Sequence, residues 1–309
     1  MNSSGSFHNG SQVSAYNDRT LVYITMAFYI LNLLYFCFFL YFISIILIVY
    51  FTTPHVRETS RYVLFAHMLV TDTLYLFLGL FLALAYQFLT MPAPICYFVL
   101  AVTTASFRVT PYNLAAMALE RYVAICYPLR YLMFCTVRRS YSVITAMWVL
   151  GLLPNVADLV VLSSSVDKSF FSQKLFCKQE GLIVLPVQDT IRSFTFIGSL
   201  ILVALVILFT YVKVMVIARK SGSSSSSASK AGRTVMLHAF QLLLSIVSLT
   251  STTTEPYGGN YVIMINFLLF MCLPRFISPL IYGIRDEVLS NCIRKMYPAV
   301  YKGKTVQKF

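Results

Sequence analysis

The chain has 309 residues, of which 58% are hydrophobic and only 11% are charged, and its mean hydropathy is +0.75. Soluble domains carry about 25% charged residues, so this composition excludes an ordinary soluble domain and indicates a polytopic membrane protein. A net charge of +13 on a soluble protein would point to nucleic acid. Here the basic residues flank apolar stretches, which favours orientation in the bilayer and contact with anionic membrane lipid, and no nucleic-acid partner.

The first 21 residues are predicted to form an extracellular tail. They are rich in Ser, Asn and Gly, and residues 1–20 are expected to lack regular structure. The segment has no apolar signal-peptide core, so the first helix would direct membrane insertion itself. Two Asn-x-Ser sequons, at Asn2 and Asn9, predict glycosylation, which would place this end outside the cell.

Seven apolar stretches follow, and each is long enough to cross a bilayer. Backbone groups in lipid must be satisfied within the span, so these stretches are predicted to be helices. The fold class is therefore all-α, a seven-transmembrane helix bundle over residues 22–284. The predicted spans are 22–51, 60–87, 95–126, 140–162, 190–219, 233–254 and 260–284.

Residues 285–309 are predicted to form a cytoplasmic segment, with a short amphipathic helix near 286–297 and then a tail. The distribution of basic residues supports this orientation. With the N-terminus outside, 17 of the 24 Lys and Arg residues lie in cytoplasmic segments and five in outer segments. This ratio fits the positive-inside rule, and the protein is expected to be a multi-pass plasma-membrane protein.

A serine-rich linker, residues 220–230, joins the fifth and sixth spans. It is either a flexible connector or a phosphorylation target for desensitisation. No internal repeat is visible, which argues against a transporter built from duplicated halves.

Asp72, Arg108 and Arg275 each lie well within a predicted span. Ionisable groups at this depth need partners or a polar cavity, and they often mark functional sites. For the two arginines, two interpretations stay open. They pair with backbone carbonyls or with Asp72, or one of them helps to bind an anionic or carbonyl-bearing ligand.

Residues 117–131, MALERYVAICYPLRY, carry a Glu120-Arg121 pair where the third span meets the cytoplasm. This run resembles the signature at the cytoplasmic end of the third helix in odorant receptors, a branch of the rhodopsin-like (class A) G protein-coupled receptors. Two further motifs resemble the same family in the right order, the start of the sixth helix at Lys230-Ala231 and the SPLIYGIR ending of the seventh helix at residues 278–285.

The resemblance implies roles for several residues. It implies a disulfide between Cys96 and Cys177, on the oxidising side of the membrane. It also implies an activation switch at the cytoplasmic face, where Arg121 is released to meet a G protein and Glu120 stands in for the usual Asp. The remaining members of this switch are Tyr122, Tyr211, Pro279, which permits a kink, and Tyr282.

By family position, a small-molecule pocket is expected between the outer halves of the third, fifth, sixth and seventh spans. Its candidate residues are Thr103, Thr104, Phe107, Arg108, Phe196 and Tyr261. The acid at the position of Asp72 often binds a sodium ion in this family. Ser44 and Ser278 stand where the family normally has Asn, so Asp72 either holds sodium or hydrogen-bonds to those hydroxyls. No other cofactor or metal is expected.

The sequence thus favours a divergent, fish-type odorant receptor that binds a small odorant and activates a stimulatory heterotrimeric G protein, with arrestin and a receptor kinase as regulatory partners. A non-olfactory chemoreceptor of the same family is the alternative. A channel or transporter is disfavoured by the odd number of spans. A membrane enzyme is disfavoured because the four histidines are scattered and neither HExxH nor GxSxG occurs.

Overall fold

The computed structural model describes residues 6–177 and 185–220 together with Phe240, Leu243, Cys272, Leu273, Arg275 and Asn291. Its helices are α1 (Ser6–Thr52), α2 (Pro54–Arg57), α3 (Ser60–Phe88), α4 (Ala93–Cys126), α5 (Tyr131–Phe134), α6 (Val137–Ser165) and α7 (Pro186–Lys220). Strand β1 (Thr90–Pro92) pairs with β2 (Lys174–Phe176), and 3-10 turns occupy Pro128–Arg130 and Lys168–Ser172.

Five of these helices are long and apolar enough to cross a membrane, which confirms the first five predicted spans. The membrane-length segments are Val22–Thr52, Ser60–Ala85, Ala93–Cys126, Val137–Ser165 and Pro186–Ile217. The predicted sixth and seventh spans, the amphipathic helix near 286–297 and residues 221–230 of the linker lie outside the described residues, except for the single residues named above.

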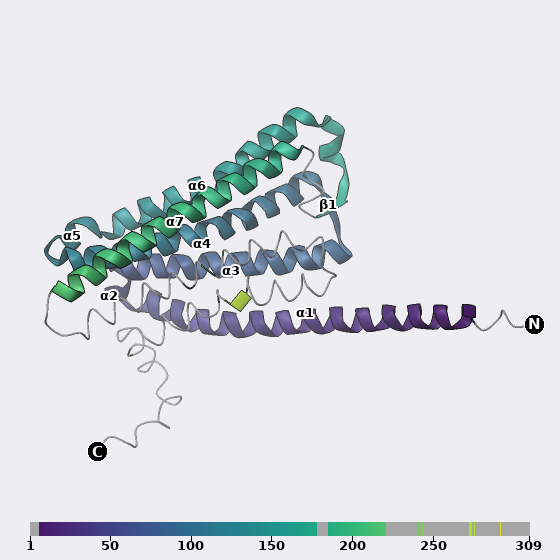
Figure 1. Ribbon diagram of the computed structural model, residues 1–309, viewed down its shortest axis with the longest axis horizontal. Coiled ribbons are helices and arrows are strands. Elements are labelled where there is room, and N and C mark those ends of the chain that lie inside the picture. The colour runs from purple at the N-terminus through teal and green to yellow at the C-terminus, as the bar shows by residue number, and fades with distance from the viewer. Residues whose placement is uncertain are drawn as a thin grey trace, which may run out of the picture.

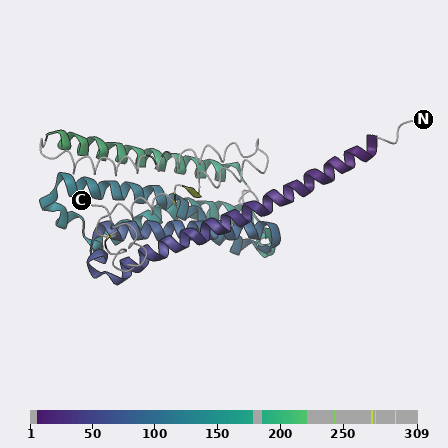
Figure 2. The same ribbon diagram turned by 90° about the horizontal axis from the view of Figure 1, so that it is seen from below.

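Helix α1 begins earlier than the sequence predicts. Residues 1–20 are expected to lack regular structure, but the helix starts at Ser6 and runs without interruption to Thr52. Figure 1 shows that α1 extends well past the ends of its neighbours, and Figure 2 shows it inclined to them. Adding a turn to an existing helix costs far less than nucleating one, so the apolar span can propagate helix into the polar residues before it.

Helix α4 is the central element of the described bundle, because it packs against α3, α6 and α7. The core between these helices includes buried Met68 and Leu69 from α3, Leu114 from α4 and Val203 from α7. The outer faces are also apolar, and exposed side chains there include Leu150, Val160, Leu202 and Leu205. Such faces suit contact with lipid tails. The inward side of each helix is therefore distinguished from the lipid-facing side by its buried polar residues and not by its apolar ones.

Hydroxyl side chains inside the spans are satisfied largely on their own helices. Thr71 donates to the His67 carbonyl at 2.8 Å, and Ser106 donates to the Val102 carbonyl at 2.8 Å. An unpaired hydroxyl in lipid would be costly. These bonds to the preceding turn therefore let polar residues occupy membrane helices without a partner helix.

Helix α6 packs tightly against α4 at Gly151. A Cβ atom there would lie 3.0 Å from Val109 Cγ2 and 3.3 Å from the Ala105 carbonyl oxygen. By contrast, a Cβ atom on Gly198 of α7 would meet nothing within 4 Å. Small residues at helix contacts let membrane helices pack closely, so Gly151 is required by packing and Gly198 is not.

We expect Gly151→Leu to destabilise the folded protein by about 1–3 kcal/mol, because the added side chain overpacks the α4–α6 contact. Gly198→Leu is the matched control, since both changes remove a glycine from a helix interior and gain similar helix propensity. Thermal melting of the detergent-solubilised protein measures both. Equal melting temperatures for the two variants would contradict the packing role of Gly151.

Candidate functional site

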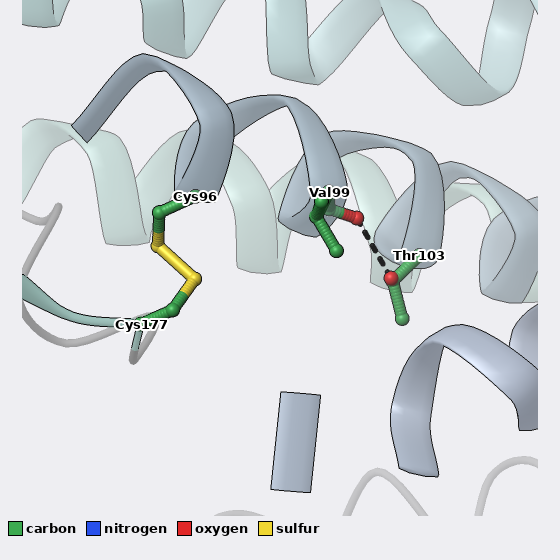
Figure 3. Close-up of a disulfide and its surroundings, with 4 residues drawn as sticks. All are labelled: Cys96, Val99, Thr103 and Cys177. Carbon is green, nitrogen blue, oxygen red and sulfur yellow. Dashed lines mark hydrogen bonds between the residues drawn. A yellow bond between two sulfur atoms is a disulfide. The ribbon is translucent and has the colours of Figure 1, made fainter. Parts of the chain in front are cut away.

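One end of the bundle, the outer end in the predicted orientation, is closed by a disulfide and a two-stranded antiparallel sheet. Cys96 near the start of α4 is bonded to Cys177 directly after β2, with an S–S distance of 2.01 Å and a Cα–Cα distance of 5.4 Å (Figure 3). Thr90 lies opposite Phe176 in the antiparallel pair of strands. The disulfide implied by the family resemblance is thus confirmed, and it holds the segment after α6 against α4.

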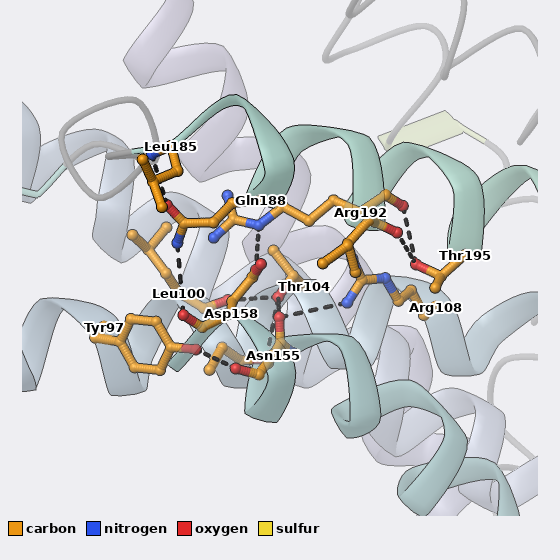
Figure 4. A network of polar contacts seen from close by, with 12 residues as sticks. Tyr97, Leu100, Thr104, Arg108, Asn155, Asp158, Leu185, Gln188, Arg192 and Thr195 are labelled. Atoms are coloured by element: carbon orange, nitrogen blue, oxygen red, sulfur yellow. Dashed lines mark hydrogen bonds and ion pairs between the residues drawn. The ribbon is translucent and has the colours of Figure 1, made fainter. Parts of the chain in front are cut away.

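A buried ion pair joins α6 to α7 in the outer half of the bundle. Arg192 Nε donates to Asp158 Oδ2, and the Asp158 side chain has no exposed surface (Figure 4). Gln188, which is also fully buried, donates from Nε2 to the Asp158 carbonyl at 3.5 Å. Opposite charges on neighbouring helices neutralise each other where solvent cannot.

Arg108 belongs to the same network but on the side of α4. Its Nη1 donates to Asn155 Oδ1 at 3.3 Å, and Thr104 Oγ1 donates to the same oxygen at 3.0 Å. Asn155 in turn donates from Nδ2 to the Ala101 carbonyl at 3.0 Å, and the backbone carbonyl of Asn155 accepts a hydrogen bond from the Tyr97 hydroxyl. Figure 4 shows these side chains converging between α4, α6 and α7. Arg108 is thus anchored by an amide of α6 and not by Asp72.

A second buried ion pair lies deeper, at Asp72 on α3. Arg275 Nε lies 3.2 Å from Asp72 Oδ1, and Thr110 Oγ1 of α4 donates to that same oxygen at 3.2 Å. The Asp72 and Arg275 side chains are 1% and 6% exposed. The pair therefore ties α3 and α4 to the region of the predicted seventh span.

Aromatic rings surround the Arg275 guanidinium. Its carbon Cζ lies 3.8 Å from the centroid of the Tyr75 ring and 5.4 Å from that of Phe107. Phe107 stacks on Phe196 of α7 with ring centroids 5.3 Å apart. Cation–π contacts are strongest where the cation is desolvated, as it is here. The charge at Asp72 is therefore connected through rings to the outer part of α7.

The predicted pocket residues fall on two faces of α4. Thr103 and Phe107 share one face, and the Thr103 hydroxyl donates to the Val99 carbonyl of its own helix at 2.7 Å (Figure 3). Thr104 and Arg108 share the other, which meets Asn155. Phe196 joins the first face through its stack on Phe107, and Tyr261 lies outside the described residues.

The opposite end of the bundle holds the Glu120-Arg121 pair. Arg121 Nε lies 3.7 Å from Glu120 Oε2, and the side chains of Arg121 and Glu120 are 21% and 6% exposed. Tyr131 at the start of α5 donates its hydroxyl to Glu120 Oε1 at 2.7 Å. Glu120 also lines a cavity of about 200 Å³ with residues of α3 and α6. The segment between α4 and α6 therefore covers this carboxylate.

Tyr131 and Cys135 lie between the spans and remain protonated at neutral pH. Burial, followed by the neighbouring Glu120 carboxylate, raises the pKa of the Tyr131 phenol above its ordinary value. The same two causes raise the pKa of the Cys135 thiol to about 11. Tyr131 therefore keeps the hydrogen that it donates to Glu120.

Helices α4 and α7 also meet near this end. The Tyr122 ring packs edge-on against Phe209, with centroids 5.6 Å apart. Tyr211, two residues further along α7, is partly buried against the core. Three other predicted site residues, Ser278, Pro279 and Tyr282, lie outside the described residues, so their roles stay predictions. The sequon at Asn2 lies outside them as well, and glycosylation of Asn2 and Asn9 also stays a prediction.

Residues 43–282 match the family described as the 7 transmembrane receptor (rhodopsin family). The match covers well over half of the chain. The chain belongs to this family. It is also similar to Odorant receptor 131-2 of Danio rerio, with 26% identity over 64% of this chain and 64% of the relative. For Olfactory receptor 2D2 of Homo sapiens the identity is 29% over 59% and 61%, and for Olfactory receptor 6K3 of Homo sapiens it is 26% over 60% and 57%.

The receptor thus spans less than two thirds of the length of these curated relatives. The architecture of this family is a membrane bundle of seven helices, in agreement with the predicted fold class. The five membrane-length helices described above account for the first five of the seven.

One predicted site residue of the receptor, Ser44, does not face the site. Ser44 was expected to approach Asp72, but it lies on the exposed face of α1, whereas its neighbour Ile43 is buried. Successive residues on a helix point about 100° apart, so an inward Ile43 turns Ser44 away. Thr110 and Arg275 supply the polar contacts to Asp72 instead.

Three further members of this polar network, Asn155, Asp158 and Gln188, are not among the site residues predicted from the sequence. Asp158 was detectable, because a lone acid within the apolar stretch 140–162 meets the criterion that singled out Asp72. Asn155 and Gln188 carry no comparable signal, since amides at these positions are recognised only through their partners in space.

Removing one member of the α6–α7 ion pair should lower the free energy of unfolding more than removing both members. Asp158→Asn leaves the Arg192 charge in a site that is 13% exposed, and we expect a loss of about 3–5 kcal/mol. The double variant Asp158→Asn with Arg192→Gln should recover much of that loss. A melting series of the wild-type receptor, both single variants and the double variant checks this, and additive effects would contradict the pairing.

Removal of the disulfide should destabilise the outer end of the receptor. Cys177→Ser opens a covalent link between residues 81 positions apart, and loss of such a link typically costs about 2–5 kcal/mol. Cys37→Ser, at an exposed free thiol, is the control. Surface expression and melting temperature should fall for the first variant and not for the second; equal values would argue against a structural disulfide.

Proposed function

We propose that this receptor is an odorant-type chemoreceptor, which binds a small molecule in the outer half of the bundle and activates a heterotrimeric G protein at the cytoplasmic face. The observation that supports this function most directly is that the two ends of the bundle differ in their chemistry. One end is closed by a disulfide and holds a buried polar network, and the other presents Arg121 beside Glu120 with 21% of its side chain exposed.

The outer half offers the chemistry that a small-molecule site requires. Phe107 and Phe196 contribute stacked rings from two helices, and Thr104 and Arg108 contribute polar groups held in place by Asn155. Apolar walls with a few fixed polar groups are typical of sites for small ligands. The names of the most similar relatives, odorant and olfactory receptors, support a small odorant as the ligand.

The contacts between α4 and α7 suggest how a ligand could act at a distance. The two helices meet through Phe107 and Phe196 in the outer half and through Tyr122 and Phe209 near the cytoplasmic end. Fifteen residues of α4 separate these contacts, which is about 22 Å along the helix. A ligand that binds more tightly when Phe107 and Phe196 are separated would favour an arrangement of the bundle in which the Tyr122–Phe209 contact also differs. The size of this shift is limited by the difference between the ligand's affinities for the two arrangements.

The distribution of basic residues supports the proposed orientation. Arg121, Arg130, Arg138 and Arg139 lie near the end that carries α5, opposite the disulfide, and basic residues favour the cytoplasmic side. The G protein would bind around Arg121 on this side. The serine-rich linker 220–230, at the end of α7, is the proposed target of a receptor kinase and of arrestin. The N-terminus would lie outside.

A cyclic AMP assay tests the function. Cells that express the receptor with a stimulatory G protein are screened against mixtures of small odorants, and an active mixture should raise cyclic AMP. Arg121→Ala should abolish the response while surface expression is retained, because the residue proposed to meet the G protein is lost. Arg138→Ala removes an exposed arginine on the same side and should leave the response close to that of the wild type.

Two outcomes would contradict the proposed function. A ligand-evoked current that needs no G protein would identify a channel. A response that survives Arg121→Ala and is lost in Arg138→Ala would place the coupling surface elsewhere.

A further inference from the structure

The family resemblance suggests a sodium ion at Asp72, and the residues around this acid can be tested for their fit to one. A sodium ion is a hard cation that would require several oxygen ligands, as other hard cations do. Asp72 Oδ1 is already bound by the Thr110 hydroxyl and the Arg275 guanidinium, each at 3.2 Å. Ser44, the hydroxyl expected to help from α1, faces outward. The donor set therefore contains a cationic group where an oxygen would be needed.

The second carboxylate oxygen is also closed to solvent in this arrangement. Asp72 Oδ2 exposes less than 1 Å² of surface, and no hydrogen bond reaches it from the described part of the chain. A hydrated or partly hydrated ion needs space for water-sized ligands beside the oxygen that it contacts. A sodium ion at Asp72 would also lie close to the positive charge of Arg275 and would be repelled by it.

We propose that Arg275 is a tethered counter-ion, which takes the place of a soluble monovalent cation at Asp72 and makes this receptor insensitive to sodium. The guanidinium neutralises the acid, and the rings of Tyr75 and Phe107, whose centroids lie 3.8 Å and 5.4 Å from Arg275 Cζ, stabilise the guanidinium. Because the cation is part of the chain, its occupancy does not depend on the salt outside the cell.

The same arrangement links the counter-ion to the ligand wall, and this link rests on the proposed function. Phe107 lies between Arg275 and Phe196 of α7. A ligand that displaces Phe107 would therefore weaken the contact that holds Arg275 over its acid. In this receptor, binding would be coupled to an internal ion pair and not to release of a sodium ion.

Thermal melting of the detergent-solubilised receptor in sodium chloride and in choline chloride, at equal ionic strength, tests the sodium claim without any ligand or G protein. The wild-type receptor should melt at the same temperature in both salts. Arg275→Gln should melt lower in choline chloride, because Asp72 loses its counter-ion. Sodium should then raise its melting temperature by about 2–4 °C, as a bound ligand would. The double variant Asp72→Asn with Arg275→Gln should not respond to sodium.

Arg275→Lys keeps a cation on the chain and should remain insensitive to sodium. The proposal is overturned if the wild-type receptor is stabilised by sodium and Asp72→Asn abolishes the effect, a result that needs no variant of Arg275 to fold. It is equally overturned if folded Arg275→Gln gains no response to sodium. Failure of the cyclic AMP assay would not alter either melting result, so the two claims fail separately.

Discussion

The ion pair between Asp72 and Arg275 is the interaction on which the described interior depends most. Neither charge is compatible with a membrane bundle alone, because a buried, unpaired ion costs several kcal/mol. Together they allow three parts of the chain to meet at one point, since Thr110 of α4 shares the oxygen that Arg275 binds. The outer pair between Asp158 and Arg192 repeats the same solution between α6 and α7. Charge neutralisation across helices thus fixes which faces turn inward.

This constraint also explains how a bundle with apolar surfaces on both sides has a defined interior. Leucine and valine are as stable against lipid as against each other, so they specify helix packing only weakly. In this arrangement of the helices, the amide of Asn155 and the carboxylates of Asp72, Asp158 and Glu120 each find a partner on a neighbouring segment. Gly151 contributes in a different way, by allowing α6 to approach the Ala105 carbonyl. Polar partners and close contacts together specify how the helices of the bundle pack against one another.

Much of the architecture could be predicted from the sequence, because hydropathy reports helix length directly. The ends of the first five spans fall within a few residues of their predictions, and Cys96 and Cys177 are bonded as the resemblance implies. The inward face of each helix was harder to predict. In α1, apolar residues surround Ser44, so no periodic pattern shows that Ile43 is the buried neighbour. The partners of Arg108 were missed for a related reason, because Asn155 lies 47 positions away and only the packing of α6 brings it close.

Charges inside this receptor are neutralised by one another across helices. An electron cryomicroscopy map of the receptor in lipid nanodiscs and sodium chloride would show this directly. We expect continuous side-chain density from Arg275 to the Asp72 carboxylate, beside the Tyr75 ring. An Arg275 side chain turned away from α3, with a separate ion density beside Asp72, would contradict it.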